Sequence, residues 1–247
     1  MVISNSAIEH CILIPGMDGT GLLYDEFQQY LANQNVHLTI LNYPTAQVLT
    51  QPELLNQLDS VLQQQDKPVW LIGESFGGHL AYQLAQQHPE KVNGLVLVAS
   101  FLTPPFFLLK LMPAKLVQFS WLCLQKTHLL RKLVISVLLH KSCSDTTKTK
   151  LSHAIKQVDA KVIASRFTQI KQLNITSELS NCHYLKPTSD LLVSNKAIHQ
   201  LSQLFNKSIC YPIKGTHFLL QTNPEKCAEI VYKIITCQGT GEAFTGE

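Results

Sequence analysis

The stretch Gly73-Glu74-Ser75-Phe76-Gly77 constrains the fold of this 247-residue chain more than any other feature. It directly follows the apolar run at residues 69–72 and leads into a helical pattern that begins at residue 76. A Gly-x-Ser-x-Gly pentapeptide in that setting is typical of a strand-to-helix turn that lifts a serine hydroxyl clear of a sheet. We expect the turn to be so tight that side chains two residues before and after the serine would collide. A Gly-rich turn that only packs a helix on a sheet is the alternative interpretation.

Short apolar runs alternate with helical periodicity along most of the chain. The candidate strands are residues 11–14, 38–41, 69–72, 95–98, 183–185 and 209–211, and the candidate helices are roughly residues 22–33, 53–65, 76–88, 195–206 and 224–237. Because the strand runs are continuously apolar, both faces of each strand should be covered, as in a parallel sheet. The predicted fold class is therefore α/β, with an open, doubly wound, mostly parallel sheet of about six strands. Its active site should lie at the carboxyl ends of the strands.

Residues 101–180 interrupt this alternation, because they show helical periodicity without a convincing strand. An insertion of this length is too long for an ordinary loop. We predict a helical cap over the strand ends, inserted before the last two strands. Residues 1–100 and 181–238 would then form the core, and the glycine-containing tail at 239–247 would be flexible.

Composition favours a globular protein without a membrane span or a secretory signal. Hydrophobic residues make up 45% of the chain and charged residues 15%, which is enough to build a sizeable core. The most apolar region, residues 101–124, is interrupted by prolines and lysines, and the N-terminus lacks a basic region. The seven cysteines lack metal-ligand spacing and are odd in number (Cys11, Cys123, Cys143, Cys182, Cys210, Cys227 and Cys237). We expect reduced thiols, a cytoplasmic location, and no metal or other cofactor.

A serine needs a base to act as a nucleophile near pH 7, and the base needs an orienting carboxylate. After a strand–turn–helix serine, the carboxylate and then the histidine follow in chain order. Asp190 follows the predicted strand at 183–185, with Glu178 as the reserve candidate, and His217 lies in a glycine-containing loop after the last predicted strand. The sequence therefore predicts Ser75, Asp190 and His217 as a catalytic triad. A solvated turn aspartate is the alternative interpretation of Asp190.

Acyl transfer through such a serine also requires donors for a tetrahedral oxyanion. We predict the backbone N–H of Phe76, next to the nucleophile and at a helix N-terminus, as one donor. The second should be the N–H of Met17, in the glycine-containing loop at residues 15–21. That loop lacks the Lys-Ser/Thr end of a phosphate-binding P-loop. Asp18 is expected to turn outward or to cap the following helix.

These elements resemble the α/β-hydrolase superfamily, with matches spread from residue 11 to residue 237. The motifs Pro-Gly-Met-Asp-Gly-Thr-Gly, Gly-Glu-Ser-Phe-Gly-Gly, Ser-Asp-Leu-Leu-Val and Gly-Thr-His-Phe-Leu-Leu-Gln are similar to those of small bacterial esterases. The resemblance implies hydrolysis of carboxylic esters, with Ser75, Asp190 and His217 at the triad positions. The first motif departs from the common His-Gly pattern. The short N-terminus implies six strands in place of eight.

Charge is divided unevenly between the predicted cap and the remaining chain. Residues 104–180 carry twelve Lys or Arg and three acidic residues, whereas the other residues carry eight basic and fourteen acidic ones. A solvated helical surface is one interpretation, and a docking surface for an acidic macromolecule is the other. A basic cap over a serine-hydrolase site resembles pimeloyl-acyl-carrier-protein methyl ester esterases of biotin synthesis. The candidate residues for carrier binding are Arg131, Lys132, Lys156, Lys161 and Arg166.

Two other functions remain open at this point. The first is a lysophospholipase, lipase or acyltransferase whose basic, apolar cap meets an anionic membrane surface. The second is a catalytically inactive scaffold used for binding, which the intact Ser-Asp-His order disfavours. Nucleic acid is not expected as a partner, because no recognition motif accompanies the basic charge.

Overall fold

The computed structural model describes residues 9–106, 109, 111–139, 143–174, 177–178, 181–204 and 209–237. Within this part, six strands form one parallel sheet in the order β2-β1-β3-β4-β5-β6. The strands are β1 (Glu9–Ile14), β2 (Val36–Ile40), β3 (Val69–Glu74), β4 (Val92–Val98), β5 (Cys182–Pro187) and β6 (Ile209–Ile213). The predicted open parallel sheet is therefore confirmed. The predicted tail at 239–247 lies outside the described residues.

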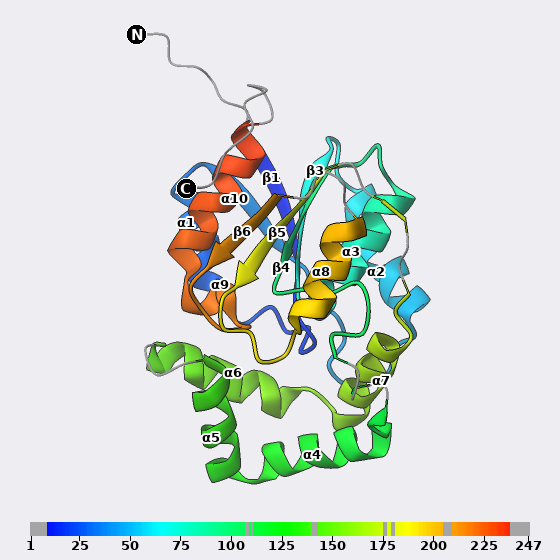
Figure 1. Ribbon diagram of the computed structural model, residues 1–247, viewed down its shortest axis with the longest axis vertical. Helices are drawn as coiled ribbons and strands as arrows, with labels where there is room; N and C mark the ends of the chain where they lie inside the picture. Colours follow the sequence, from blue (N-terminus) through cyan, green and yellow to red (C-terminus); the bar gives the residue numbers. More distant parts are fainter. Residues whose placement is uncertain are drawn as a thin grey trace.

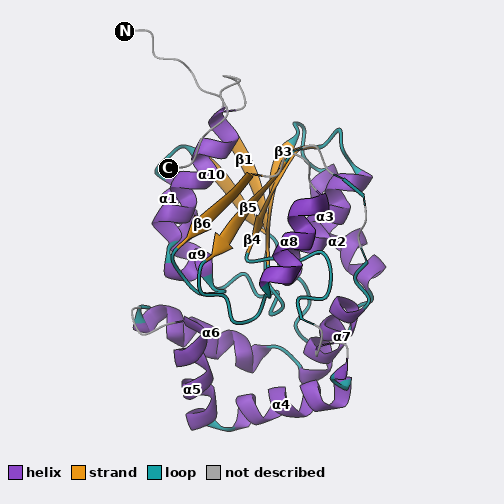
Figure 2. Cartoon of the chain, viewed as in Figure 1, coloured by secondary structure: helices purple, strands orange, loops and turns teal. Residues whose placement is uncertain are grey.

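Helices cover both faces of the sheet (Figure 1; Figure 2). They are α1 (Asp25–Ala32), α2 (Gln51–Gln63), α3 (Phe76–Gln87), α8 (Asn195–Leu204), the single turn α9 (Leu219–Thr222) and α10 (Pro224–Cys237). Helices α1 and α10 pack on one face, and α2, α3 and α8 pack on the other. The helix predicted at 53–65 begins two residues earlier than expected, because Thr50 and Glu53 form a capping box at its N-terminus.

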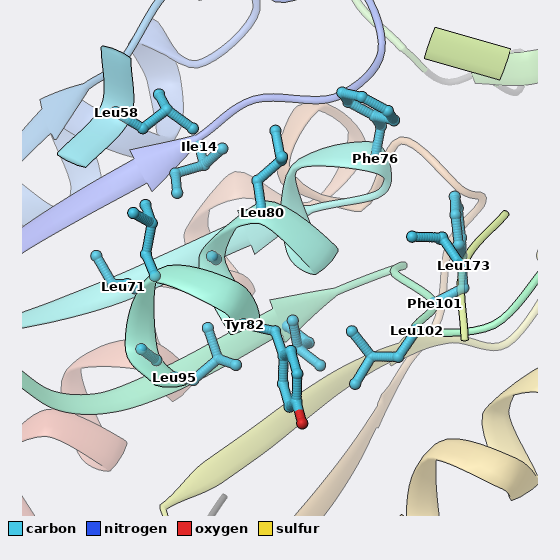
Figure 3. Packing of buried hydrophobic residues seen from close by; sticks show 14 of the residues in the cluster. Ile14, Leu58, Leu71, Phe76, Leu80, Tyr82, Leu95, Phe101, Leu102 and Leu173 are labelled. Atoms are coloured by element: carbon cyan, nitrogen blue, oxygen red, sulfur yellow. The ribbon is translucent and has the colours of Figure 1, made fainter. Parts of the chain in front are cut away.

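Alternate residues of the inner strands β1, β3, β4 and β5 serve the two hydrophobic cores. In β1, Cys11 and Leu13 belong to the core beneath α1 and α10, whereas Ile12 and Ile14 belong to the core beneath α2 and α3. Figure 3 shows the second core, where strand residues face the side chains of α3. Burial on both faces explains the continuously apolar strand sequences.

Among the residues described between β4 and β5, four α-helices lie at the place in the chain where the cap was predicted. They are α4 (Ala114–Lys126), α5 (His128–Leu139), α6 (Asp145–Gln157) and α7 (Ala160–Lys171). Figure 1 shows these helices, drawn in green, lying beyond the carboxyl ends of the strands. Trp121 Nε1 donates a hydrogen bond to Val158 O at 2.9 Å, which ties α4 to the residue that caps the end of α6. No helix in the described part of the chain has the length and hydropathy needed to span a bilayer.

Candidate active site

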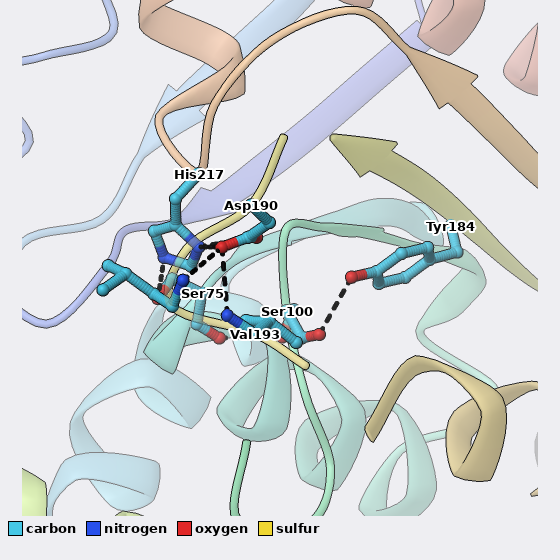
Figure 4. A network of polar contacts seen from close by, with 7 residues as sticks. Ser75, Ser100, Tyr184, Asp190, Val193 and His217 are labelled. Atoms are coloured by element: carbon cyan, nitrogen blue, oxygen red, sulfur yellow. Dashed lines mark hydrogen bonds and ion pairs between the residues drawn. The ribbon is translucent and has the colours of Figure 1, made fainter. Parts of the chain in front are cut away.

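Ser75 occupies the turn between β3 and α3 in a strained backbone conformation. Its φ is 50° and its ψ is −119°, in a region that non-glycine residues rarely adopt. The turn is held from the neighbouring strand, because Ser75 N donates to Val98 O at 3.0 Å and Ser100 Oγ donates to Ser75 O at 2.7 Å. Tyr184 OH supports Ser100 in turn by donating to its carbonyl oxygen at 3.1 Å (Figure 4). The serine is therefore fixed at the carboxyl end of the sheet.

The two glycines of the motif are required by different close approaches. A Cβ on Gly73 would lie 2.5 Å from Gly78 Cα, within the turn itself. A Cβ on Gly77 would instead lie 2.2 Å from Ile14 O, at the end of β1. Gly77 therefore allows the turn between β3 and α3 to pack against the loop that follows β1. The glycine at this position is not needed to avoid a collision with residue 73.

His217 lies between Ser75 and Asp190 in the geometry of a charge-assisted triad (Figure 4). Its Nε2 is 2.8 Å from Ser75 Oγ, and its Nδ1 is 2.9 Å from Asp190 Oδ2. The side chains of His217 and Asp190 are 8% and 3% exposed, so the pair is largely shielded from water. This arrangement places a base against the hydroxyl and a carboxylate against the base.

The loops that carry the acid and the base are fastened to each other. Asp190 Oδ1 accepts hydrogen bonds from Leu192 N at 2.7 Å and Val193 N at 3.0 Å, which orients the carboxylate. Ser189 N donates to Gly215 O at 3.0 Å, joining the loop after β5 to the loop after β6. Glu178, the reserve candidate, is exposed in the segment between α7 and β5.

The loop after β1 lies directly against Ser75, as an oxyanion site would require. A Cβ built on Gly16 would lie 3.8 Å from Ser75 Cβ. Within the described part of the chain, neither Met17 N–H nor Phe76 N–H donates a hydrogen bond to another protein group. Both donors therefore remain available to a ligand. Asp18 accepts from Thr20 N at 3.0 Å and so closes a turn within its own loop.

Two side chains hold this loop in place from outside. Arg166 of α7 donates from Nη1 to Met17 O at 2.7 Å and from Nη2 to Pro44 O at 2.7 Å. Its guanidinium also stacks over the Tyr43 ring at 4.8 Å, and the Tyr43 hydroxyl donates to Gly16 O at 2.9 Å. Arg166 therefore connects the helical insertion to the candidate oxyanion loop.

Replacing Arg166 with Met should lower kcat by roughly tenfold to hundredfold, because a small displacement of the Met17 N–H weakens its hold on the oxyanion. Arg166→Lys should recover little of that loss, since an ammonium group cannot span the same carbonyl oxygens. Steady-state kinetics should show the loss in kcat rather than in KM. Lys196→Met, an exposed change on α8, is the matched control for loss of a cation. A fall of similar size in the control would contradict the positioning role.

The predicted carrier-binding cations divide into two groups. Lys132, Lys156 and Lys161 are exposed. Arg131 and Arg166 are buried, and this corrects their assignment to an exposed docking surface. Arg131 donates from Nη1 to Leu124 O at 2.8 Å and so caps the carboxyl end of α4. Both arginines donate hydrogen bonds to backbone carbonyl groups inside the protein, so their side chains do not face a binding partner.

Glu74 is a buried charged group that the sequence reasoning did not assign. Its Oε2 accepts from Tyr24 OH at 2.6 Å and from Gln221 Nε2 at 3.1 Å. Tyr24 OH in turn accepts from Gly16 N at 3.1 Å, so the network joins the residue before Ser75 to the loop after β1. Burial raises the pKa of the Glu74 carboxyl to about 7, and Asp18 adds to the rise, while Tyr24, Gln221 and His217 oppose it.

The raised pKa predicts how Glu74 affects stability. Its pKa rises from the ordinary 4.5 to about 7 on folding, so the folded state binds the proton more tightly between these values. The contribution of Glu74 to stability is therefore full below pH 4.5 and is lost as the pH rises to about 7. Glu74→Gln mimics the neutral acid. Its free energy of unfolding, relative to that of the unmodified protein, should therefore rise by about 2 kcal/mol from pH 5 to pH 8. Urea unfolding at the two pH values measures this difference. A difference that does not change with pH would contradict the raised pKa.

A family model described as the alpha/beta hydrolase fold matches residues 12–124 of the chain. Among curated proteins, phytyl ester synthase 1 from the chloroplast of Arabidopsis thaliana is 33% identical over 92 residues. That alignment covers 35% of this chain and 13% of the plant protein, so the chain spans only a small part of that relative.

Solved structures resemble the chain over nearly its whole length. A thermophilic esterase from Thermogutta terrifontis superposes with a TM-score of 0.73 at 14% identity, covering 92% of this chain and 89% of the esterase. The type II thioesterase BorB from the borrelidin biosynthetic cluster gives a TM-score of 0.64 at 18% identity, covering 93% and 94%. At these identities the likeness concerns the fold. Together with the parallel sheet, the strand-to-helix serine and the family-model match, it shows that the chain has the α/β-hydrolase fold.

Proposed function

We propose that the protein hydrolyses carboxylic esters through an acyl-enzyme on Ser75. The observation that carries this proposal is the position of His217, which lies 2.8 Å from Ser75 Oγ and 2.9 Å from Asp190 Oδ2. A histidine placed between a hydroxyl and a buried carboxylate is the arrangement that activates a serine for acyl transfer.

In the first half-reaction, His217 Nε2 takes the proton of Ser75 as the serine oxygen attacks the ester carbonyl carbon. The N–H groups of Met17 and Phe76 stabilise the resulting oxyanion. The tetrahedral intermediate then collapses, and the alcohol leaves with the proton from His217. Water repeats the sequence on the acyl-enzyme and releases the carboxylic acid. Throughout, Asp190 fixes the imidazole tautomer and stabilises its cation.

Oxygen esters and thioesters both fit this chemistry, because either leaving group departs from the same tetrahedral intermediate. The likeness to an esterase and to a thioesterase supports this breadth without choosing between the two. The narrower proposal depends on what the helical insertion recognises.

One candidate substrate is the methyl ester of pimeloyl-acyl carrier protein, as in biotin synthesis. The observation that favours it is the group of exposed lysines Lys132, Lys156 and Lys161 on three helices of the insertion. An acidic carrier would be attracted to these cations, and the attraction would weaken with salt. The burial of Arg131 and Arg166 removes two of the five cations from this candidate interface.

The other candidate substrate is an acyl ester presented at a lipid surface. The protein would then act as a lipase or lysophospholipase, which hydrolyses the ester, or as an acyltransferase, which transfers its acyl group. The observation that favours it is the set of exposed apolar side chains on α4 and α5, including Phe119 at 64% and Leu129 at 77% exposed. The relationship to a phytyl ester synthase adds support, since its name describes an ester of a lipid alcohol.

Turnover of methyl pimeloyl-acyl carrier protein and of a matched free methyl ester distinguishes the two candidates. Under the carrier proposal, kcat/KM for the carrier-bound ester should be at least tenfold higher at low salt and should lose that advantage near 0.5 M salt. Lys156→Glu/Lys161→Glu should abolish the advantage, and Lys67→Glu, at an exposed site away from the insertion, should preserve it. Equal turnover of the two esters at all salt concentrations would exclude the carrier.

A further inference from the structure

Helix α4 is largely apolar, yet none of its residues is buried in the protein. Leu116 is 51% exposed and Phe119 is 64% exposed. Lys115, Phe119, Leu122 and Lys126 are all exposed and follow one another at helical spacings of four, three and four, so they form one row along the helix. The row places two large apolar side chains between two lysines.

Helix α5 repeats this arrangement immediately afterwards. Leu129, Leu133 and Val137 are spaced by four residues and lie on one side, with exposed fractions of 77%, 62% and 56%. The opposite side is buried through Arg131, Ile135 and Leu139. We call the exposed apolar residues Leu116, Phe119, Leu122, Leu129, Leu133 and Val137, together with the exposed lysines Lys115, Lys126 and Lys132, the α4–α5 surface.

The charged residues of this surface are all lysines, and the exposed carboxylate of Asp145, which lies outside it, interacts with Lys132. No Asp or Glu occurs between Glu90 and Asp145 in the sequence. The occupant of the surface must therefore accept apolar side chains and bring negative charge. A second copy of this chain brings the same lysines, so pairing two α4–α5 surfaces would place like charges together. A folded acidic carrier brings the charge but presents a water-facing surface to the leucines.

We propose that the α4–α5 surface docks the protein on anionic lipid membranes, an inference that rests on the proposed ester hydrolysis and names where its substrate is met. A bilayer interface supplies an apolar layer for Phe119, Leu129 and Leu133, and anionic headgroups for the lysines beside them. This combination of leucine, phenylalanine and lysine on short helices is typical of segments that lie in the interface and do not span the membrane.

The inner side of the insertion connects this surface to the active site. Val117 and Trp121 of α4 pack on a cluster formed by Val158 at the end of α6 and by Val162 and Ile163 of α7. Met17 packs on the same cluster. Figure 1 shows α4 on the side of the insertion away from the sheet. Docking through the α4–α5 surface therefore puts the membrane on the side where the strands end and Ser75 is located.

Vesicle sedimentation with the full chain tests the proposal without depending on turnover. The probes are vesicles of phosphatidylcholine alone and vesicles that contain about 30% phosphatidylglycerol. The protein should bind the anionic vesicles at least tenfold more tightly than the neutral ones. Lys126→Glu/Lys132→Glu should weaken that binding about twentyfold or more, and Leu129→Ser/Leu133→Ser should weaken it at least tenfold. Tyr232→Ser and Lys67→Glu, exposed changes elsewhere, should retain it.

Several results would overturn the proposal. One is the absence of binding to anionic vesicles at low salt, and another is binding that both double variants retain. Dimerisation that Leu129→Ser/Leu133→Ser abolishes, without vesicle binding, would make the surface a self-interface. Capture of acyl carrier protein that Lys126→Glu/Lys132→Glu abolishes, without vesicle binding, would make it a carrier site.

The Ser75→Ala protein separates this proposal from the proposed function, because it should bind vesicles as the unmodified protein does. Vesicle binding without ester cleavage by the unmodified protein would leave docking intact and remove the proposed function. Ester cleavage without vesicle binding would leave the proposed function intact and remove the docking proposal.

Discussion

Ser75→Ala should lower kcat by about 10⁴- to 10⁶-fold, because the variant retains the oxyanion donors and loses the nucleophile. The residue that replaces serine keeps the same backbone, and the contacts of Ser75 N and Ser75 O with Val98 and Ser100 are unaffected by loss of the hydroxyl. The variant should therefore fold. Initial rates on a p-nitrophenyl ester, measured beside thermal unfolding, check both expectations.

Ser189→Ala is the matched control, because Ser189 is an exposed serine in the loop that carries Asp190. It should keep kcat within a few-fold of the unmodified protein. Substantial turnover by folded Ser75→Ala would show that another group attacks the ester.

Asp190→Asn should lower kcat by about 10⁴-fold, because asparagine keeps the size of the side chain but does not hold the required imidazole tautomer. The asparagine oxygen can still accept from Leu192 N and Val193 N, so the loop should keep its conformation. His217→Ala should be at least as severe, since it removes the base itself. Rates across the pH range from 6 to 9 would separate a lost base from a shifted one.

Glu178→Gln provides the comparison for Asp190→Asn, because Glu178 is the exposed acid that follows α7. Its rate should remain near that of the unmodified protein. A larger loss in Glu178→Gln than in Asp190→Asn would mean that the acid of the triad has been misassigned.

The sequence was sufficient for the fold and for a site hypothesis because the decisive signals are local. Continuous apolar runs predicted the six strands, and the Gly-x-Ser-x-Gly pentapeptide predicted the strained turn at Ser75. The order of the loops then favoured His217 as the base and Asp190 as the acid, with Glu178 in reserve, and the structure brings His217 and Asp190 to hydrogen-bonding distance. Chain order is informative here because the carboxyl ends of parallel strands meet at one edge of the sheet.

Contacts between segments that are distant in the sequence could not be predicted from local patterns. Glu74 meets Tyr24 and Gln221, which are 50 and 147 residues away in the sequence. The only local signal was a charged residue at the end of a buried strand. Gly77 was correctly expected to be small, but its neighbours are the carbonyl oxygens of Ile14 and Pro15 and not the other side of the turn.

The count of charged residues also does not distinguish buried cations from exposed ones. Arg131 and Arg166 contribute to the positive balance of the insertion, yet each folds inward onto backbone carbonyl groups. Arginine is suited to this role, because its planar fork can serve several acceptors at once. Helical periodicity alone did not separate them from Lys132, Lys156 and Lys161, which remain exposed.

Labelling with a fluorophosphonate probe, followed by peptide mapping, tests whether Ser75 is the activated nucleophile. The probe phosphonylates an activated serine, so it reports the nucleophile without assuming a substrate. We predict a single adduct on Ser75 that is absent from Ser75→Ala and forms far more slowly in His217→Ala. An adduct on another serine, or labelling that persists in folded Ser75→Ala, would contradict it.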